Sequence, residues 1–211
     1  HYYNPKYFRI SSYDQKRIIR AFKKNIKNLK MPNLLCFENI STELSQLYSR
    51  LSESKYVTLT LRDYGYNNNR STSQKDLDNS ILFAESQGAK LVIIPDVLEN
   101  LSNYLIPDNV LVSVSSRKLI NDRVYVYSKS LINLFSPSGA YSISLCIKNA
   151  KSIMFNFAKG GFDSSEDYYL KNYNLSLGEQ PYLKIKGYLL WNSIFPDYTV
   201  NDLLYAYKIL T

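Results

Sequence analysis

Hydrophobic positions in the first quarter of the chain recur at helical spacing. Residues 14–30 carry one apolar stripe, formed by Ile18, Ile19, Phe22, Ile26 and Leu29. The rest of that stretch is basic, with Lys16, Arg17, Arg20, Lys23, Lys24 and Lys27. Residues 41–51 predict a second helix, with Ser41 as its N-cap. We therefore expect an N-terminal helical segment over residues 1–54.

From residue 55 onward, short apolar runs typical of strands alternate with helical stretches. The expected strands lie at 56–61, 91–94, 110–114, 131–135 and 152–157, and the expected helices at 74–87, 100–105 and 116–130. In the helix at 74–87 we expect a C-cap at Gly88 and core-facing residues at Leu77, Ile81, Leu82 and Ala84. Strands that alternate with helices predict parallel pairing with right-handed crossovers. We expect an α/β domain over residues 55–211, with a mostly parallel sheet flanked by helices.

Candidate chemistry gathers where the expected strands end, because ligands of such sheets bind beyond the carboxyl ends of the strands. Those ends are residues 62–70, Asp96, Ser115, 136–140 and 158–162. The most informative one follows the apolar run 131–135 and reads Ser136-Pro137-Ser138-Gly139-Ala140. A strand that stops at small residues and opens a helix leaves backbone N–H groups unpaired, which suits a phosphate. A plain strand–helix connection is the alternative.

Composition and charge narrow the function classes. A chain of 211 residues with 45% hydrophobic residues has enough apolar material for one large packed domain. The net charge of +8 favours an anionic partner, whether a phosphorylated ligand, an anionic membrane surface or nucleic acid. His1 is the single histidine, which excludes a histidine triad or a histidine zinc site within this sequence. Cys36 and Cys146 are expected to be reduced thiols, the latter buried.

The order of the short motifs carries a family resemblance. These motifs are Thr60-Leu61-Arg62, Arg70-Ser71, Ile94-Pro95-Asp96, Arg123 and Ser136 to Gly139, followed by Glu179-Gln180-Pro181 and Leu189-Leu190-Trp191. Residues 55 to about 209 resemble the C-terminal, donor-binding half of GT-B-type bacterial glycosyltransferases of surface-polysaccharide biosynthesis. The resemblance implies a Rossmann-like domain, a nucleotide-sugar donor, a glycan or lipid-linked acceptor, and no cofactor.

The resemblance also implies roles for single residues. The leaving nucleotide phosphate gains negative charge, and a site without a metal offsets it with arginine and backbone amides. The expected donor-phosphate residues are Arg62, Arg70, Ser136, Ser138 and Gly139. The expected base and ribose residues are Tyr64, Tyr66, Asp96 and Glu166, with Asp167 beside it. No catalytic residue is assigned.

Each of these residues also has a structural interpretation. The arginines can pair with Asp63 or Asp96, Arg123 can be a structural residue of its helix, and Asp96 can cap a helix or a turn. Glu166 and Asp167 can be first-turn acids, Tyr64 and Tyr66 exposed loop residues, and Trp191 part of the core.

Family members of this type have two halves, whereas about 50 residues precede the recognised one here. The resemblance therefore implies a missing N-terminal acceptor domain, a partner half on another polypeptide, or a domain that is not catalytic by itself. The alternative function is a non-catalytic α/β module that binds a phosphorylated ligand or a partner.

The basic helix at 14–30 has two interpretations. Its apolar stripe packs on the domain, or the helix lies on an anionic membrane surface. Because no apolar run approaches the roughly 20 residues of a membrane span and the start is polar, we expect a cytoplasmic protein, peripheral on the inner face of the membrane in the second case. Nucleic acid is not an expected partner, because the basic residues concentrate on one helix and no known binding motif is present.

Overall fold

The computed structural model describes residues 39–63, 71–136, 138–144, 146–147, 150–155, 188–190 and 199–211. The basic helix predicted at 14–30 lies outside these residues, so its two interpretations stay predictions. No helix in the described ranges is both long enough and apolar enough to cross a membrane.

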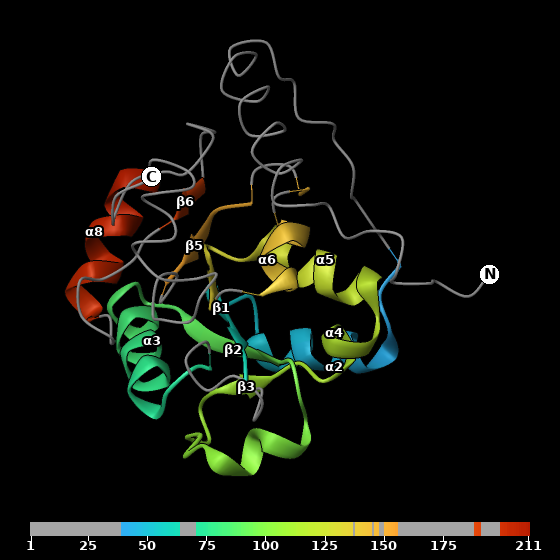
Figure 1. Ribbon diagram of the computed structural model, residues 1–211. Coiled ribbons are helices and arrows are strands. Elements are labelled where there is room, and N and C mark those ends of the chain that lie inside the picture. The colour runs from blue at the N-terminus through green and yellow to red at the C-terminus, as the bar shows by residue number, and fades with distance from the viewer. Residues whose placement is uncertain are drawn as a thin grey trace, which may run out of the picture.

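A parallel sheet forms the centre of the fold, with the strand order β3-β2-β1-β4-β5-β6 (Figure 1). The strands are β1 Tyr56–Leu61, β2 Lys90–Pro95, β3 Leu111–Val112, β4 Asn133–Phe135, β5 Ser152–Met154 and β6 Tyr188–Leu190. The α/β, Rossmann-like fold class is therefore confirmed. Several strands are shorter than their apolar runs, since pairing in β3 covers two residues and in β5 three.

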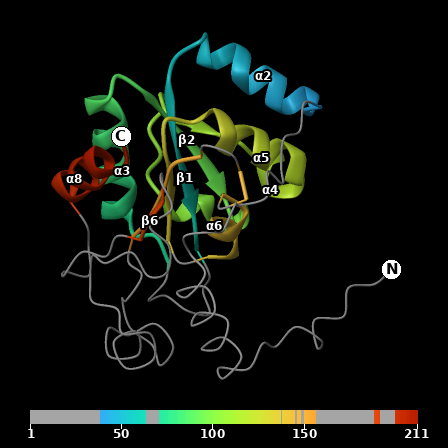
Figure 2. The same cartoon turned by 90° about the horizontal axis from the view of Figure 1, so that it is seen from above.

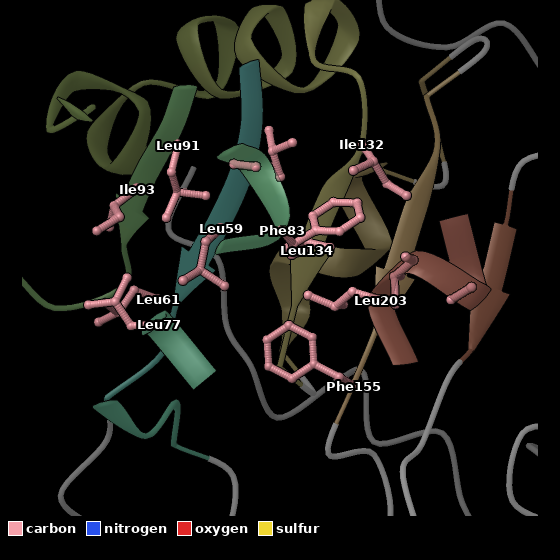
Figure 3. Close-up of a cluster of buried hydrophobic side chains, with 14 of the residues drawn as sticks. Leu59, Leu61, Leu77, Phe83, Leu91, Ile93, Ile132, Leu134, Phe155 and Leu203 are labelled. Atoms are coloured by element: carbon pink, nitrogen blue, oxygen red, sulfur yellow. The ribbon is translucent and has the colours of Figure 1, made fainter. Parts of the chain in front are cut away.

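Helices cover both faces of the sheet (Figures 1 and 2). One face carries α3 Gln74–Ser86 and α8 Val200–Leu210, and the other carries α2 Thr42–Leu51, α4 Ser115–Lys118, α5 Ile120–Lys129 and α6 Gly139–Ser144. A short 3-10 helix, η4 Glu99–Asn103, lies in the connection between β2 and β3. Successive side chains of a strand point to opposite faces of the sheet, so the odd-numbered residues of β1 face α3 and α8. There Leu59 and Leu61 pack with Leu77, Phe83 and Leu203 (Figure 3).

The opposite face of β1 is polar yet buried. Thr58 and Thr60 are fully buried, and each has a partner: the Thr58 hydroxyl donates to Asn133 Oδ1 at 2.7 Å, and Thr60 Oγ1 lies 2.7 Å from the Tyr127 hydroxyl. A buried hydroxyl is costly only when it lacks a hydrogen bond. The YVTLTL strand therefore sits at the centre of the sheet without an energetic penalty from its threonines.

Helix α2 is fixed to the α4–α5 face through its first turn. Ser41 is its N-cap, as predicted, and accepts from the Leu44 amide. The buried Asp122 in turn accepts from the Ser41 amide at 2.9 Å, and the Ser115 amide donates to Glu43 Oε1 at 3.1 Å. The α2 residues Leu44, Leu47 and Leu51 complete the core on this side. A helix from the predicted N-terminal segment thus packs directly on the sheet.

Two details of the helix predicted at 74–87 are wrong: the residues that face the core and the position of the C-cap. In α3, Leu82 is 53% exposed and Phe83 takes the core position, because the buried stripe runs through Asp76, Leu77, Ser80, Phe83 and Ala84. Because this stripe contains two polar residues, the hydrophobic pattern alone does not show which face of the helix is buried. The C-cap of α3 is Gln87, and Gly88 follows it with a φ of +61°.

The side chain of Cys146, which was expected to be buried, is half-buried.

The single helix predicted at 116–130 is two helices. Leu119 between α4 and α5 has extended backbone angles, φ −110° and ψ 119°. Neither glycine nor proline marks the break. The Arg123 side chain bridges it, since its Nε donates to the Ser116 carbonyl at 2.7 Å and its terminal NH2 nitrogen to the Arg117 carbonyl at 3.4 Å. Carbonyl groups left open at the end of α4 are satisfied in this way.

Candidate functional site

The strand order places a topological switch point between β1 and β4. Chain progress runs from β1 outward to β2 and β3 on one side, and from β4 outward to β5 and β6 on the other. In open parallel sheets ligands bind in the crevice beyond the carboxyl ends of the two strands at such a point. Arg62 follows β1 directly and Ser136 follows β4 directly. Two of the predicted phosphate-binding residues therefore follow the ends of neighbouring strands at this point.

Thr72 connects these two residues. Its hydroxyl accepts from the Arg62 amide at 3.1 Å and lies 3.1 Å from the Ser136 hydroxyl. The Thr72 amide also donates to the Arg62 carbonyl at 2.7 Å, so the chain that leaves β1 returns to the same place. Thr72 and Ser136 are both buried, at 3% and 0% exposure. The backbone around Arg62 is thereby held against the turn after β4.

Helix α3 begins immediately after this bridge. Ser73 is its N-cap and forms a capping box with Asp76, in which the Ser73 hydroxyl accepts from the Asp76 amide and the Asp76 carboxylate accepts from the Ser73 amide. The cap fixes the end of the β1–α3 connection. Thr72 was missed by the sequence analysis, although its place just before an S-x-x-D cap was a usable signal.

The turn after β4 is only partly as predicted. The Ser138 hydroxyl is buried and has no hydrogen-bond partner among the described residues. Gly139 is exposed, and a Cβ built on it would meet nothing within 4 Å. Its φ lies outside the left-handed region, so neither packing nor backbone conformation requires a glycine here. Helix α6 has only 6 residues, so its dipole adds little to phosphate binding beside Arg62 and the hydroxyl groups.

Asp96 lies at the carboxyl end of β2, beside three arginines. Its amide donates to the Leu61 carbonyl at 2.9 Å, and Arg117 Nε donates to the Asp96 carbonyl at 2.8 Å. Burial raises the pKa of the Asp96 carboxyl group, and the charges of Arg123, Arg62 and Arg117 oppose that rise. Asp96 and Arg62, both predicted from their places at strand ends, therefore lie near each other, whereas Arg117 was not predicted.

The start of the β1–α3 connection is tied to the η4 segment. The Asp63 carbonyl accepts from Asn100 Nδ2 at 2.9 Å, and its carboxylate accepts from Asn103 Nδ2 at 3.1 Å. The Tyr104 hydroxyl donates to the Thr72 carbonyl at 2.7 Å. Burial raises the pKa of the Tyr104 hydroxyl further above its already high ordinary value. Both ends of the connection are thus anchored.

The remaining predicted site residues lie outside the described part of the chain. They are Arg70, Tyr64, Tyr66 and Glu166, with Asp167 and Trp191. Within the described part, no group of three histidine, cysteine or acidic residues is placed to hold a metal ion.

Comparison with known proteins gives matches among solved structures. No protein-family model and no curated protein matches the sequence. The fold is similar to a glycosyl transferase of family 9 from Veillonella parvula, with a TM-score of 0.55 and 9% identity over 84% of this chain and 54% of that one. It is also similar to the ADP-heptose LPS heptosyltransferase II of E. coli, with a TM-score of 0.50 and 11% identity over 87% of this chain and 56% of that one.

The chain thus spans about half the length of each of these two structures. At such low identity the likeness shows the fold and not a shared activity. The order of the strands, the switch point and these matches confirm the resemblance at the level of fold: the chain has an α/β, Rossmann-like architecture similar to about half of each of these two glycosyltransferase structures.

Proposed function

We propose that the chain is the C-terminal, donor-binding half of a glycosyltransferase that moves a sugar from a nucleotide-sugar to a glycan or lipid-linked acceptor of surface-polysaccharide biosynthesis. The observation that carries the proposal is the Arg62–Thr72–Ser136 arrangement at the switch point. Both similar structures are named as glycosyltransferases, and one name includes an ADP-heptose donor, which supports the same class of reaction.

The chemistry needs groups that stabilise a leaving phosphate. When the glycosidic bond to the nucleotide breaks, negative charge grows on the phosphate oxygens. The Arg62 guanidinium is suited to forked hydrogen bonding with these oxygens, and Ser138 and the Gly139 amide add donors from the neighbouring strand end. The buried Ser136 hydroxyl holds Thr72 behind them. Arg70 comes from the same connection as Arg62. In this proposal the phosphate is stabilised by the protein without a metal ion.

The nucleoside lies toward β2 in this arrangement. Asp96 accepts from a ribose hydroxyl, as acidic residues at such strand ends do in related sheets. Tyr64 or Tyr66 stacks on the base, and Glu166 adds a second hydroxyl acceptor. Arg62 follows β1, the central neighbour of both β2 and β4, so a ligand that contacts Asp96 and Ser136 must pass it.

In this proposal a second half supplies the acceptor site and the catalytic base. The chain covers 54% and 56% of the two similar structures. We propose that the acceptor and the catalytic base are held by another domain or polypeptide, that residues 55–211 form the nucleotide-sugar domain, and that residues 1–54 form its helical segment. The basic helix at 14–30 then places this cytoplasmic enzyme on the anionic inner face of the membrane, close to a lipid-linked acceptor.

A titration tests the donor-site proposal. The purified chain is titrated calorimetrically with the diphosphates of adenosine, guanosine, cytidine, uridine and thymidine, and with cytidine monophosphate. At least one is expected to bind, and Arg62→Gln is expected to weaken it by about tenfold to a hundredfold, as the loss of a charge-assisted hydrogen bond of about 1.5–3 kcal/mol requires.

Arg50→Gln is the matched control. Arg50 is an exposed arginine in the last turn of α2, at the end of the fold where β1 begins. Its loss removes the same charge without touching the strand ends. Equal affinity of Arg62→Gln and Arg50→Gln rejects the donor site. A chain that binds inorganic phosphate but none of the nucleotides is instead the non-catalytic phospho-ligand module.

A further inference from the structure

Two further arginines, Arg117 and Arg123, lie near Asp96 beside the proposed phosphate site. Arg117 belongs to α4, which follows β3, and its Nε lies 2.8 Å from the Asp96 carbonyl oxygen at the end of β2. Arg123 belongs to α5 and lies against α4, with its Nε 2.7 Å from the Ser116 carbonyl oxygen. Both side chains are half-buried. Arg117 therefore reaches from the carboxyl end of β3 to that of β2, and Arg123 contacts the backbone of Arg117 from α5.

Most of their hydrogen-bonding capacity is unused within the described part of the chain. A guanidinium group has five N–H donors. Arg117 uses one, and Arg123 uses its Nε and one terminal nitrogen; every acceptor is a backbone carbonyl oxygen. Among the described residues neither arginine forms an ion pair with a carboxylate. Both half-buried guanidinium groups thus keep N–H donors for which the described residues supply no acceptor.

Asp96 is the carboxylate that acts on this pair, and it is shared with Arg62. Arg123, Arg62 and Arg117 all act on it electrostatically, yet burial raises its pKa and so disfavours its charged form. One carboxylate stands against the two charges of Arg117 and Arg123. An oxyanion from a ligand would supply the missing negative charge, and planar forks of this kind fit carboxylate and phosphate groups.

The position separates this pair from the switch point. Ser136 follows β4 and Asp96 follows β2, and β1 lies between them. Adjacent strands are about 4.8 Å apart, so the two strand ends are about 10 Å apart along the rim. A group bound at Arg117, on the β3 side of Asp96, is therefore distinct from a phosphate held at the turn after β4.

We propose that Arg117 and Arg123 form a second oxyanion subsite, which takes a carboxylate or phosphate group carried by the substrates in addition to the donor phosphate. The inference rests on the proposed function for its substrates: the group is either the carboxylate of an acidic donor sugar or the phosphate of a phosphorylated acceptor. Its chemistry is the same in both cases, and the probes below distinguish them.

The test follows the arginine side chains directly. The 15N-labelled chain is titrated with sodium acetate, as a carboxylate probe, and with methyl phosphate, as a phosphate probe, at constant ionic strength to hold screening fixed. The Nε–H signals of Arg117 and Arg123 are expected to shift and saturate with at least one probe, and to do so in Arg62→Gln as well. A preference for acetate indicates the acidic sugar, and a preference for methyl phosphate indicates the acceptor.

Three variants decide whether the subsite is real. Arg117→Gln is expected to raise the dissociation constant of the preferred probe at least tenfold, Arg117→Lys to recover part of the loss, and Lys118→Gln, an exposed neighbour, to change nothing. The subsite is overturned if the wild-type Arg117 and Arg123 signals saturate with neither probe. It is also overturned if Arg117→Gln binds the preferred probe as tightly as Lys118→Gln does.

The two proposals fail separately. Nucleoside diphosphate binding that depends on Arg62, with no saturable response at Arg117 and Arg123, overturns the subsite alone. A saturable response at both arginines in a chain that binds none of the nucleotides rejects the transferase assignment and leaves an oxyanion site.

Discussion

The hydroxyl oxygens of Thr72 and Ser136 lie 3.1 Å apart, although 64 residues separate them in the sequence. One precedes the helix that follows β1, and the other ends the strand β4. Because the Thr72 hydroxyl also accepts from the Arg62 amide, the contact fixes the start of an arginine-bearing connection against the serine–glycine turn. The proposed phosphate site depends on this relationship.

Thr72→Val is expected to destabilise the fold by about 1–3 kcal/mol, because valine keeps the shape but leaves the Arg62 amide and the buried Ser136 hydroxyl without this partner. Urea unfolding measures the change. Thr72→Ser, which keeps the hydroxyl, is expected to lose clearly less. Equal midpoints for the valine variant and wild type would show that the bridge contributes nothing.

Gly139→Ala separates stability from binding. A Cβ at this position meets no atom within 4 Å, and the backbone conformation is open to any residue, so thermal stability is expected to stay within about 0.5 kcal/mol of wild type. A phosphate held against the Gly139 amide would meet the new methyl group, so nucleotide affinity is expected to fall. An alanine variant that binds as tightly as wild type removes Gly139 from the site.

Asp122→Ala tests how α2 is held. The buried carboxylate accepts from both the amide and the hydroxyl of Ser41, and its loss is expected to cost about 2–3 kcal/mol. Asp202→Ala is the control, because Asp202 makes a similar contact to Thr199 in an exposed capping box of α8 and is expected to cost less. Calorimetric melting of both variants ranks the two contacts, and a larger loss for Asp202→Ala would contradict this account.

Asp96 makes stability depend on pH in an unusual direction. Burial raises its pKa in the folded state above the ordinary value, so the folded chain binds its proton more tightly than the unfolded chain does. The Asp96 contribution to stability therefore falls as pH rises from the ordinary carboxyl pKa of about 3.9 through the folded-state pKa, and stays low above it.

Asp96→Asn removes this titration. The variant is expected to be more stable than wild type at pH 7, and the difference is expected to shrink as pH falls below the folded-state pKa. Urea midpoints measured from the ordinary carboxyl pKa of about 3.9 upward to neutral pH test the sign. A variant that is less stable than wild type at pH 7 would mean that the three arginines outweigh burial.

Much of the fold was predictable because local pattern and tertiary structure agree. The YVTLTL run became β1, and Ser41 became the N-cap of α2. The positions that failed are those where polar contacts decide the structure. Leu82 is exposed because Asp76 and Ser80 share the buried stripe of α3. The helix break at Leu119 depends on the Arg123 side chain, which no local signal marks.

The candidate site was predictable in part for a similar reason. Arg62, Asp96 and Ser136 follow strands, so the rule that ligands bind at strand ends identified them. Thr72 and Arg117 act through contacts between elements distant in sequence, to Ser136 and to the Asp96 carbonyl. Such contacts depend on the strand order, and the alternation of strands and helices does not specify that order.

In the proposed function, a nucleotide phosphate binds at the switch point between β1 and β4. The most direct test is an amide chemical-shift titration with the tightest-binding nucleoside diphosphate. We predict that the largest amide shifts fall on Arg62, Thr72, Ser138 and Gly139. The Gly88 amide, which lies just before the start of β2 and so at the other end of the sheet, is expected to stay unchanged. Shifts confined to other surfaces, or absent at saturation, would contradict the claim.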